Sequence, residues 1–206
     1  MGGNDINTLQ KIMTEGKIEF LQKGFKDASL RSIVRQAGVT TGAFYGYFPD
    51  KQALFEALVS PAVNGLRELF LNVHKEFNEL PGDTQLDTAY DYSANKLKIF
   101  IAYIYDNFDE FKLLITCAEG TAFEDFIHSL AEIEVDYTLK FFEATGNDAL
   151  ASGRITLKLV HIISSAYFSA VFEIVEHDMA REEADRYIDS LSNFFIAGWK
   201  AILLSS

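Results

Sequence analysis

Apolar residues recur along this chain every three or four positions, which is the spacing of helices that bury one face. No segment alternates apolar and polar residues in the way that a half-buried strand does. The pattern therefore predicts an all-α fold of about nine helices. We expect these helices near residues 12–23, 30–37, 41–47, 52–80, 86–104, 108–120, 123–146, 154–176 and 182–204.

Capping residues divide the first sixty positions into short helices. Gly24 and Gly38 are expected to end the first and second helices, because glycine readily adopts the left-handed conformation that follows a helix. Side-chain oxygens that accept the free amide hydrogens of a following helix are expected from Ser29, from Thr40 or Thr41, and from Asp50.

Two short helices that meet at Gly38, braced by a longer first helix, form a helix-turn-helix pattern. In such a unit the second short helix enters the major groove of DNA. We expect Thr41 and Ala43 to lie nearest the bases, and Tyr45 and Lys51 to hold phosphates. The full set expected at the DNA is Ser29, Arg31, Thr40, Thr41, Gly42, Ala43, Tyr45, Tyr47 and Lys51.

The segment from Ile12 to Leu58 resembles the N-terminal signature of the TetR family of bacterial transcription regulators. The matching residues, in about a quarter of the chain, are Phe20, Gly24, Phe25, Ser29, Ile33, the run Ala37–Tyr45, Phe48, Lys51 and Leu54. The resemblance implies a homodimer that binds a palindromic DNA operator and usually represses transcription, and the sequence leaves repressor versus activator open. It also implies an inducer pocket in the C-terminal domain.

The chain departs from that family in ways that concern DNA affinity. Many relatives carry Lys at the position of Thr41 and His or a similar residue at that of Tyr47, and residues 1–10 contain no Lys or Arg. Fewer phosphate contacts predict weaker binding with a shallower salt dependence. The net charge is −12, yet residues 1–60 hold seven basic and six acidic residues, so the acidic excess lies beyond them. An acidic body repels DNA and leaves the N-terminal part to face it.

Aromatic residues concentrate on the core-facing stripes of the predicted fifth to eighth helices, which predicts a cavity with apolar walls. We expect an apolar or aromatic effector with no more than one charge, because burying an ion without a partner costs on the order of several kcal/mol. The alternative is that these side chains fill the space completely. The expected lining residues are Phe100, Tyr103, Ile104, Phe111, Cys117, Phe126, Leu130, Tyr137, His161 and Phe168.

The predicted organisation has a DNA-binding domain in residues 1–50 and a regulatory, dimerising domain in residues 51–206. A homodimer is expected through the last two helices. Small residues of the eighth helix (Ser164, Ser165, Ala166, Ser169 and Ala170) allow close approach, and the ninth helix carries Tyr187, Leu191, Phe194, Phe195, Trp199 and Ile202.

Other classes of protein fit the sequence less well. We find no metal-binding spacing, phosphate loop or nucleophile motif, so we expect no catalytic residue, metal or cofactor. The main alternative is a helical small-molecule sensor or interaction protein that has lost DNA binding. The single cysteine, the N-terminus without a basic start and apolar core, and the lack of a long uncharged apolar run favour a cytoplasmic protein without a membrane partner.

Overall fold

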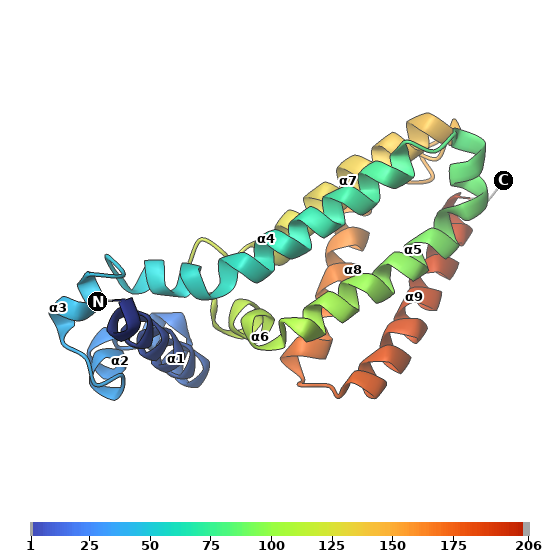
Figure 1. The fold of residues 1–206 in the computed structure, drawn as a ribbon. Helices are drawn as coiled ribbons and strands as arrows, with labels where there is room; N and C mark the ends of the chain where they lie inside the picture. The colour runs from blue at the N-terminus through green and yellow to red at the C-terminus, as the bar shows by residue number, and fades with distance from the viewer. Residues whose placement is uncertain (1, 204–206) are drawn as a thin grey trace. The chain divides into compact units, whose positions relative to one another are not determined.

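The structure is a computed structural model that describes residues 2–203, with side chains described from residue 7 onward (Figure 1). The all-α prediction is confirmed, since these residues form nine α-helices and no strand. The helices are α1 (Gly2–Asp27), α2 (Leu30–Gln36), α3 (Thr41–Tyr45), α4 (Lys51–Asn78), α5 (Gly82–Asp106), α6 (Phe108–Cys117), α7 (Phe126–Thr145), α8 (Leu157–Glu176) and α9 (Arg181–Leu203).

The predicted caps form at the starts of α2, α3 and α4. The Ser29 hydroxyl accepts the amide hydrogen of Ser32 at 3.4 Å, the Thr40 hydroxyl accepts that of Ala43 at 3.1 Å, and the Asp50 carboxylate accepts that of Ala53 at 2.8 Å. Gly24 and Gly38 both have positive φ, of 73° and 64°. The helix goes on for one more turn after Gly24, as a kinked end of α1.

Four predicted helix starts are wrong: the first and fifth helices begin earlier, at Gly2 and Gly82 instead of residues 12 and 86, and the seventh and eighth begin three residues later. The seventh helix begins at Phe126 instead of Phe123, because the hydroxyl of Thr121 accepts the Phe123 amide hydrogen and donates to the Ala118 carbonyl, which holds a turn. The eighth helix begins at Leu157 instead of Arg154, because Thr156 is its N-cap. The predicted end of the last helix at Leu204 lies outside the described residues.

The chain divides into two compact units. The N-terminal unit is Met1–Asn64 with Asn107–Glu124, and the C-terminal unit is Gly65–Asp106 with Asp125–Ser206. The predicted boundary at residue 50 falls just before α4, which contributes residues to both units. As a division of function, that boundary stays a prediction.

Phenylalanine rings form much of the core of the N-terminal unit. Phe55 packs edge-on against Phe20 and Phe25, with centroid separations of 5.2 and 5.4 Å. Phe20, Phe44 and Phe55 are completely buried. These contacts tie α1 to α4 and set the frame on which α2 and α3 are held.

Ion pairs attach α6 to α1 within the same unit. The Lys17 ammonium lies 2.7 Å from Asp109 and 3.2 Å from Glu110, and Lys26 lies 2.5 Å from Glu119. The predicted sixth helix, α6, therefore packs against α1 within the N-terminal unit.

Helices α5, α7, α8 and α9 and the second half of α4 form the C-terminal unit, in which α5 runs beside α9 (Figure 1). The α4 backbone approaches α5 closely at Gly65, where an added Cβ would lie only 2.0 Å from the Tyr103 hydroxyl. Helix α8 has the length and mean hydropathy (1.4) of a membrane-crossing helix, a property that core helices of water-soluble proteins share.

Candidate functional site

Helix α3 presents an exposed, capped surface at the end of the N-terminal unit. Phe44 anchors it, since this ring is completely buried and lies 5.8 Å from Phe48. Thr41 and Gly42 are exposed at its first turn, and Tyr45 is 55% exposed. The helix therefore offers polar groups to a partner while its other face is fixed in the core.

The α2 helix is held in place by a buried carboxylate. Glu19 is only 6% exposed, and its carboxylate accepts hydrogen bonds from Lys23 Nζ at 2.6 Å and from the Ser29 amide at 3.0 Å. Burial opposes ionisation, but the hydrogen bonds from Lys23, Ser29 and Ser32 outweigh it and lower the pKa of Glu19. The ionised Glu19 carboxylate thus links α1 to the N-terminus of α2 through its hydrogen bonds to Lys23 and the Ser29 amide.

Lys51, at the start of α4, binds backbone carbonyl oxygens at the C-terminal end of α1. Its ammonium donates to the carbonyl oxygens of Phe25 at 2.6 Å, Ala28 at 3.0 Å and Lys26 at 3.2 Å, and lies 4.5 Å from the Phe25 ring centroid. Those carbonyls end the kinked last turn of α1, where a cation is stabilising. The side chain predicted to hold a phosphate is therefore engaged within the protein.

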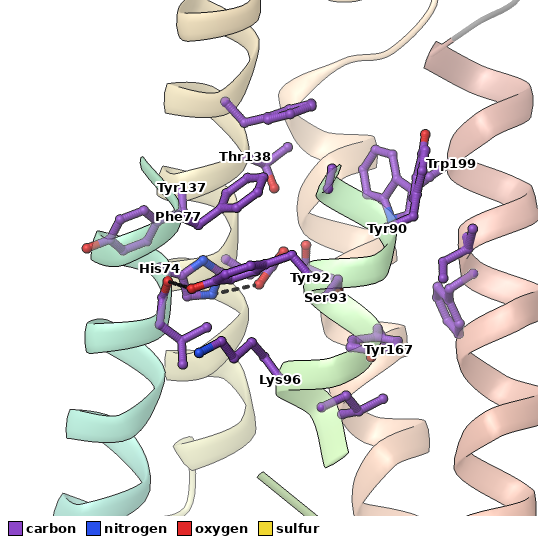
Figure 2. Close-up of a pocket in the computed structure, with 18 of the residues that line it drawn as sticks. His74, Phe77, Tyr90, Tyr92, Ser93, Lys96, Tyr137, Thr138, Tyr167 and Trp199 are labelled. Atoms are coloured by element: carbon purple, nitrogen blue, oxygen red, sulfur yellow. Dashed lines mark hydrogen bonds and ion pairs between the residues drawn. The ribbon is translucent and has the colours of Figure 1, made fainter. Parts of the chain in front are cut away.

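A cavity of about 310 Å³ opens among α4, α5, α7, α8 and α9 of the C-terminal unit. Twelve of the 28 residues that line it are Phe, Tyr or Trp. Figure 2 shows His74 and Phe77 of α4 facing Tyr137 of α7, with Tyr90 of α5 and Trp199 of α9 across the space. The volume is near the lower limit of about 300–1,000 Å³ for ligand pockets of proteins.

Polar groups lie on one part of the aromatic lining. The His74 Nε2 atom lies 3.2 Å from the Glu134 carboxylate, and the His74 ring stacks on Tyr137 at 4.6 Å. Lys96 lies 3.5 Å from Glu76 and 5.0 Å from the centroid of the Tyr92 ring. The lining therefore combines ring faces with the His74–Glu134 contact and with Lys96, which pairs with Glu76.

Comparison with known proteins links the N-terminal surface to a family. Residues 12–58 match the model of the N-terminal domain of "bacterial regulatory proteins, tetR family". The chain is 37% identical over 76 residues to the HTH-type transcriptional regulator AcrR of Shigella flexneri. Residues 12–58, about a quarter of the chain, are therefore similar to the N-terminal domain of TetR-family regulators.

Other similarities to transcription regulators differ in extent. An uncharacterised HTH-type transcriptional regulator of Bacillus subtilis, YdgC, is 32% identical over 69 residues. These alignments cover 37% and 34% of this chain, and about a third of the length of AcrR and YdgC. A TerR/AcrR-family transcriptional regulator from Aquifex aeolicus shares the whole fold, at a TM-score of 0.54 and 17% identity, over 95% of this chain and 99% of its own.

The residues predicted at the DNA lie in the N-terminal unit, and most of them are exposed. Arg31, Thr41, Gly42 and Tyr45 are exposed, while Ala43 and Tyr47 are half-buried. Ser29 and Thr40 are also exposed and cap helices, and the half-buried Lys51 binds carbonyl oxygens. Contact of each with DNA stays a prediction.

Three of the ten residues predicted to line a ligand cavity do so: Phe100, Tyr137 and Phe168. The structure places the others away from the lining: Phe111 and Cys117 in the N-terminal unit, and Tyr103, Ile104, Phe126, Leu130 and His161 elsewhere in the C-terminal unit. Phe126 does not border the cavity because its ring packs edge-on against Phe172, with centroids 5.8 Å apart. His161 packs against His128 instead, with ring centroids 5.0 Å apart.

The polar part of the lining was not predicted from the sequence. His74 and Glu134 are far apart in sequence, and neither carried a motif. The available signal was the position of His74 beside Val73 and one turn before Phe77, on the stripe already assigned to the core of the fourth helix. Among residues with described side chains, no three or more His, Cys, Asp or Glu are grouped as metal ligands.

Proposed function

We propose that this protein is a DNA-binding transcription regulator, with α2 and α3 as its DNA-reading helices. The observation that carries the proposal is the capped α3 helix, with exposed Thr41, Gly42 and Tyr45, inside the segment that matches the TetR domain. The hydroxyls suit phosphate contacts, and small residues at the first turn suit close approach to bases. Such a function requires a location where the protein meets DNA, which in bacteria is the cytoplasm, and it requires no catalytic site.

We assign the cavity in the C-terminal unit to a small effector that controls DNA binding. Its volume and aromatic lining support an apolar or aromatic molecule, as the sequence analysis expects. An effector acts only through a difference in affinity between the DNA-binding and the released states. The regulation that we propose is repression, relieved when the effector binds.

A homodimer through α8 and α9 completes the proposal. Exposed apolar side chains on these helices include Leu157 at 55%, Ile162 at 51% and Phe194 at 73%. Phe195, Trp199 and Ser164, which the sequence also suggested for the interface, line the cavity instead. A two-fold dimer places two α3 helices on half-sites about one helical turn apart, which predicts a palindromic operator. Light scattering that finds a monomer at micromolar concentration contradicts this part.

Selection from a random pool of duplex DNA tests the DNA-reading assignment. We expect enrichment of one palindromic sequence at low salt. Thr41→Ala should alter the selected bases, whereas Tyr45→Phe should weaken binding to all duplexes alike, because one contact reads bases and the other a phosphate. A helical sensor without DNA binding, the alternative function, enriches no sequence.

A further inference from the structure

We infer that the cavity in the C-terminal unit binds an organic ammonium ion with an apolar body, with Glu134 as its counter-charge and aromatic rings around it. This inference rests on the proposed role of the cavity as the effector site. It narrows the expected apolar effector to one sign of charge.

Glu134 supplies a carboxylate inside the aromatic lining. Among the described residues that line the cavity it is the one acidic side chain, and its partner is the His74 imidazole, whose Nε2 atom lies 3.2 Å from the carboxylate. Burial raises the pKa of the Tyr167 hydroxyl, and the negative charge of Glu134 raises it further. A cation that enters here meets a carboxylate as well as ring faces.

The rings of this cavity already bind ammonium groups of the chain itself. Lys140 lies 4.3 Å from the centroid of Tyr137, Lys200 lies 4.6 Å from that of Tyr90, and Lys96 lies 5.0 Å from that of Tyr92. All three tyrosines line the cavity. The negative face of an aromatic ring attracts a cation, and several rings around one cation form a recurrent recognition site for organic ammonium ions.

Ser164 leaves a polar group for a ligand. It is 2% exposed, lines the cavity on α8, and its hydroxyl has no hydrogen-bond partner in the structure. A buried hydroxyl without a partner is unfavourable, and an ammonium donor satisfies its oxygen. Ser164 therefore adds an independent polar contact one helical turn before Tyr167.

The charge of the surrounding unit favours the same sign of ligand. The segments Gly65–Asp106 and Asp125–Ser206 together hold 20 acidic and 10 basic residues, a net charge of −10. Such a field draws cations toward the protein and repels anions. Lys96 is the one lysine of the lining, and its charge is offset by Glu76 at 3.5 Å.

Three probes of matched shape test the inference: phenylbutylamine, phenylbutanol and phenylbutyrate, which carry one positive charge, no charge and one negative charge at neutral pH. Trp199 is the only tryptophan of the chain and lines the cavity, so its fluorescence reports on occupancy. We expect the amine to bind at least about tenfold more tightly than the alcohol, the ratio that one charged hydrogen bond supplies, and the carboxylate to bind most weakly.

Glu134→Gln removes the charge while keeping an oxygen for His74. We expect this variant to lose the preference for the amine and to bind phenylbutanol as before, which also shows that the cavity is intact. Glu132→Gln is the matched control, because Glu132 is exposed, pairs with His128 and lies off the cavity; it should keep the preference.

Equal or tighter binding of the alcohol or the carboxylate overturns the inference, and so does the absence of any bound probe or an unchanged preference in Glu134→Gln. The proposed function is judged separately by duplex selection. If the amine binds but DNA affinity does not change, the ligand class stands and the assignment of the cavity to regulation fails.

Discussion

Aromatic side chains are abundant in both units, but they are arranged differently. In the N-terminal unit Phe20, Phe25 and Phe55 contact one another around a core from which three capped helix starts project. In the C-terminal unit the rings of five helices surround a cavity of about 310 Å³. Close packing fixes a surface for reading a partner, whereas incomplete packing leaves room for one to enter. The difference explains how one small chain can hold a recognition surface and a binding cavity.

The largest contrast should appear when one ring is removed from each unit. Phe55→Ala should destabilise the N-terminal unit by about 3–5 kcal/mol, because it removes a completely buried ring and leaves a new cavity. Phe141→Ala should cost clearly less, because this half-buried ring already borders a cavity. Urea unfolding followed by circular dichroism measures both, and equal costs would contradict the contrast in packing.

Glu19→Gln should lower the free energy of unfolding by about 1.5–3 kcal/mol, because it weakens charge-assisted hydrogen bonds to Lys23 and the Ser29 amide. The pKa of Glu19 is lowered in the folded state, so its contribution is complete above the ordinary glutamate pKa of 4.5 and is lost as the pH falls through the lowered value. The difference between wild type and variant should therefore shrink in acid. Glu15→Gln, a half-buried change on the same helix, serves as the control, and a difference independent of pH would argue against the proposed role of Glu19.

Lys51→Met separates a structural role from a phosphate contact. Loss of three carbonyl contacts should cost about 1–3 kcal/mol of stability and weaken binding to all duplexes with an unchanged salt slope. Arg31→Met, on exposed α2, should instead reduce the slope by about one unit if Arg31 holds a phosphate. Salt titrations of duplex binding distinguish them. A reduced slope for Lys51→Met would restore the phosphate assignment made from the sequence.

Ser164→Ala should have the smallest effect on stability. Removing a buried hydroxyl that has no partner should be neutral or stabilising by up to about 1 kcal/mol. Because that corresponds to an increase of about 2–4 °C in Tm for a chain of this size, thermal unfolding resolves it. A clear decrease in Tm would show that the Ser164 hydroxyl has a stabilising partner.

The sequence was sufficient for most of the N-terminal unit because the signals there are local. Ser29, Thr40 and Asp50 accept amide hydrogens three residues ahead, and Gly24 and Gly38 adopt the positive φ expected of them. Spacing along the chain is enough to predict such contacts. It was not enough for Lys51, whose carbonyl partners lie 23 to 26 residues away.

The cavity depends on contacts between distant helices, which helical periodicity does not specify. A stripe predicts that Phe126 and Phe168 face a core, but Phe126 packs against Phe172 while Phe168 reaches the cavity. Placing α6 beside α1 likewise took Phe111 and Cys117 out of the predicted lining. Periodicity gives the buried face of each helix, but tertiary packing decides which buried residues border a space.

The central claim is that occupancy of the C-terminal cavity controls DNA binding by the N-terminal unit. Both can be measured in one titration with phenylbutylamine, using Trp199 fluorescence for the cavity and fluorescence anisotropy of a labelled, selected duplex for DNA. We predict that the duplex dissociates over the same concentration range in which the fluorescence of Trp199 changes, with a coupling of about 1–3 kcal/mol, or roughly 5- to 150-fold in duplex affinity. Saturation of the Trp199 signal while the duplex stays bound with unchanged affinity would contradict the claim.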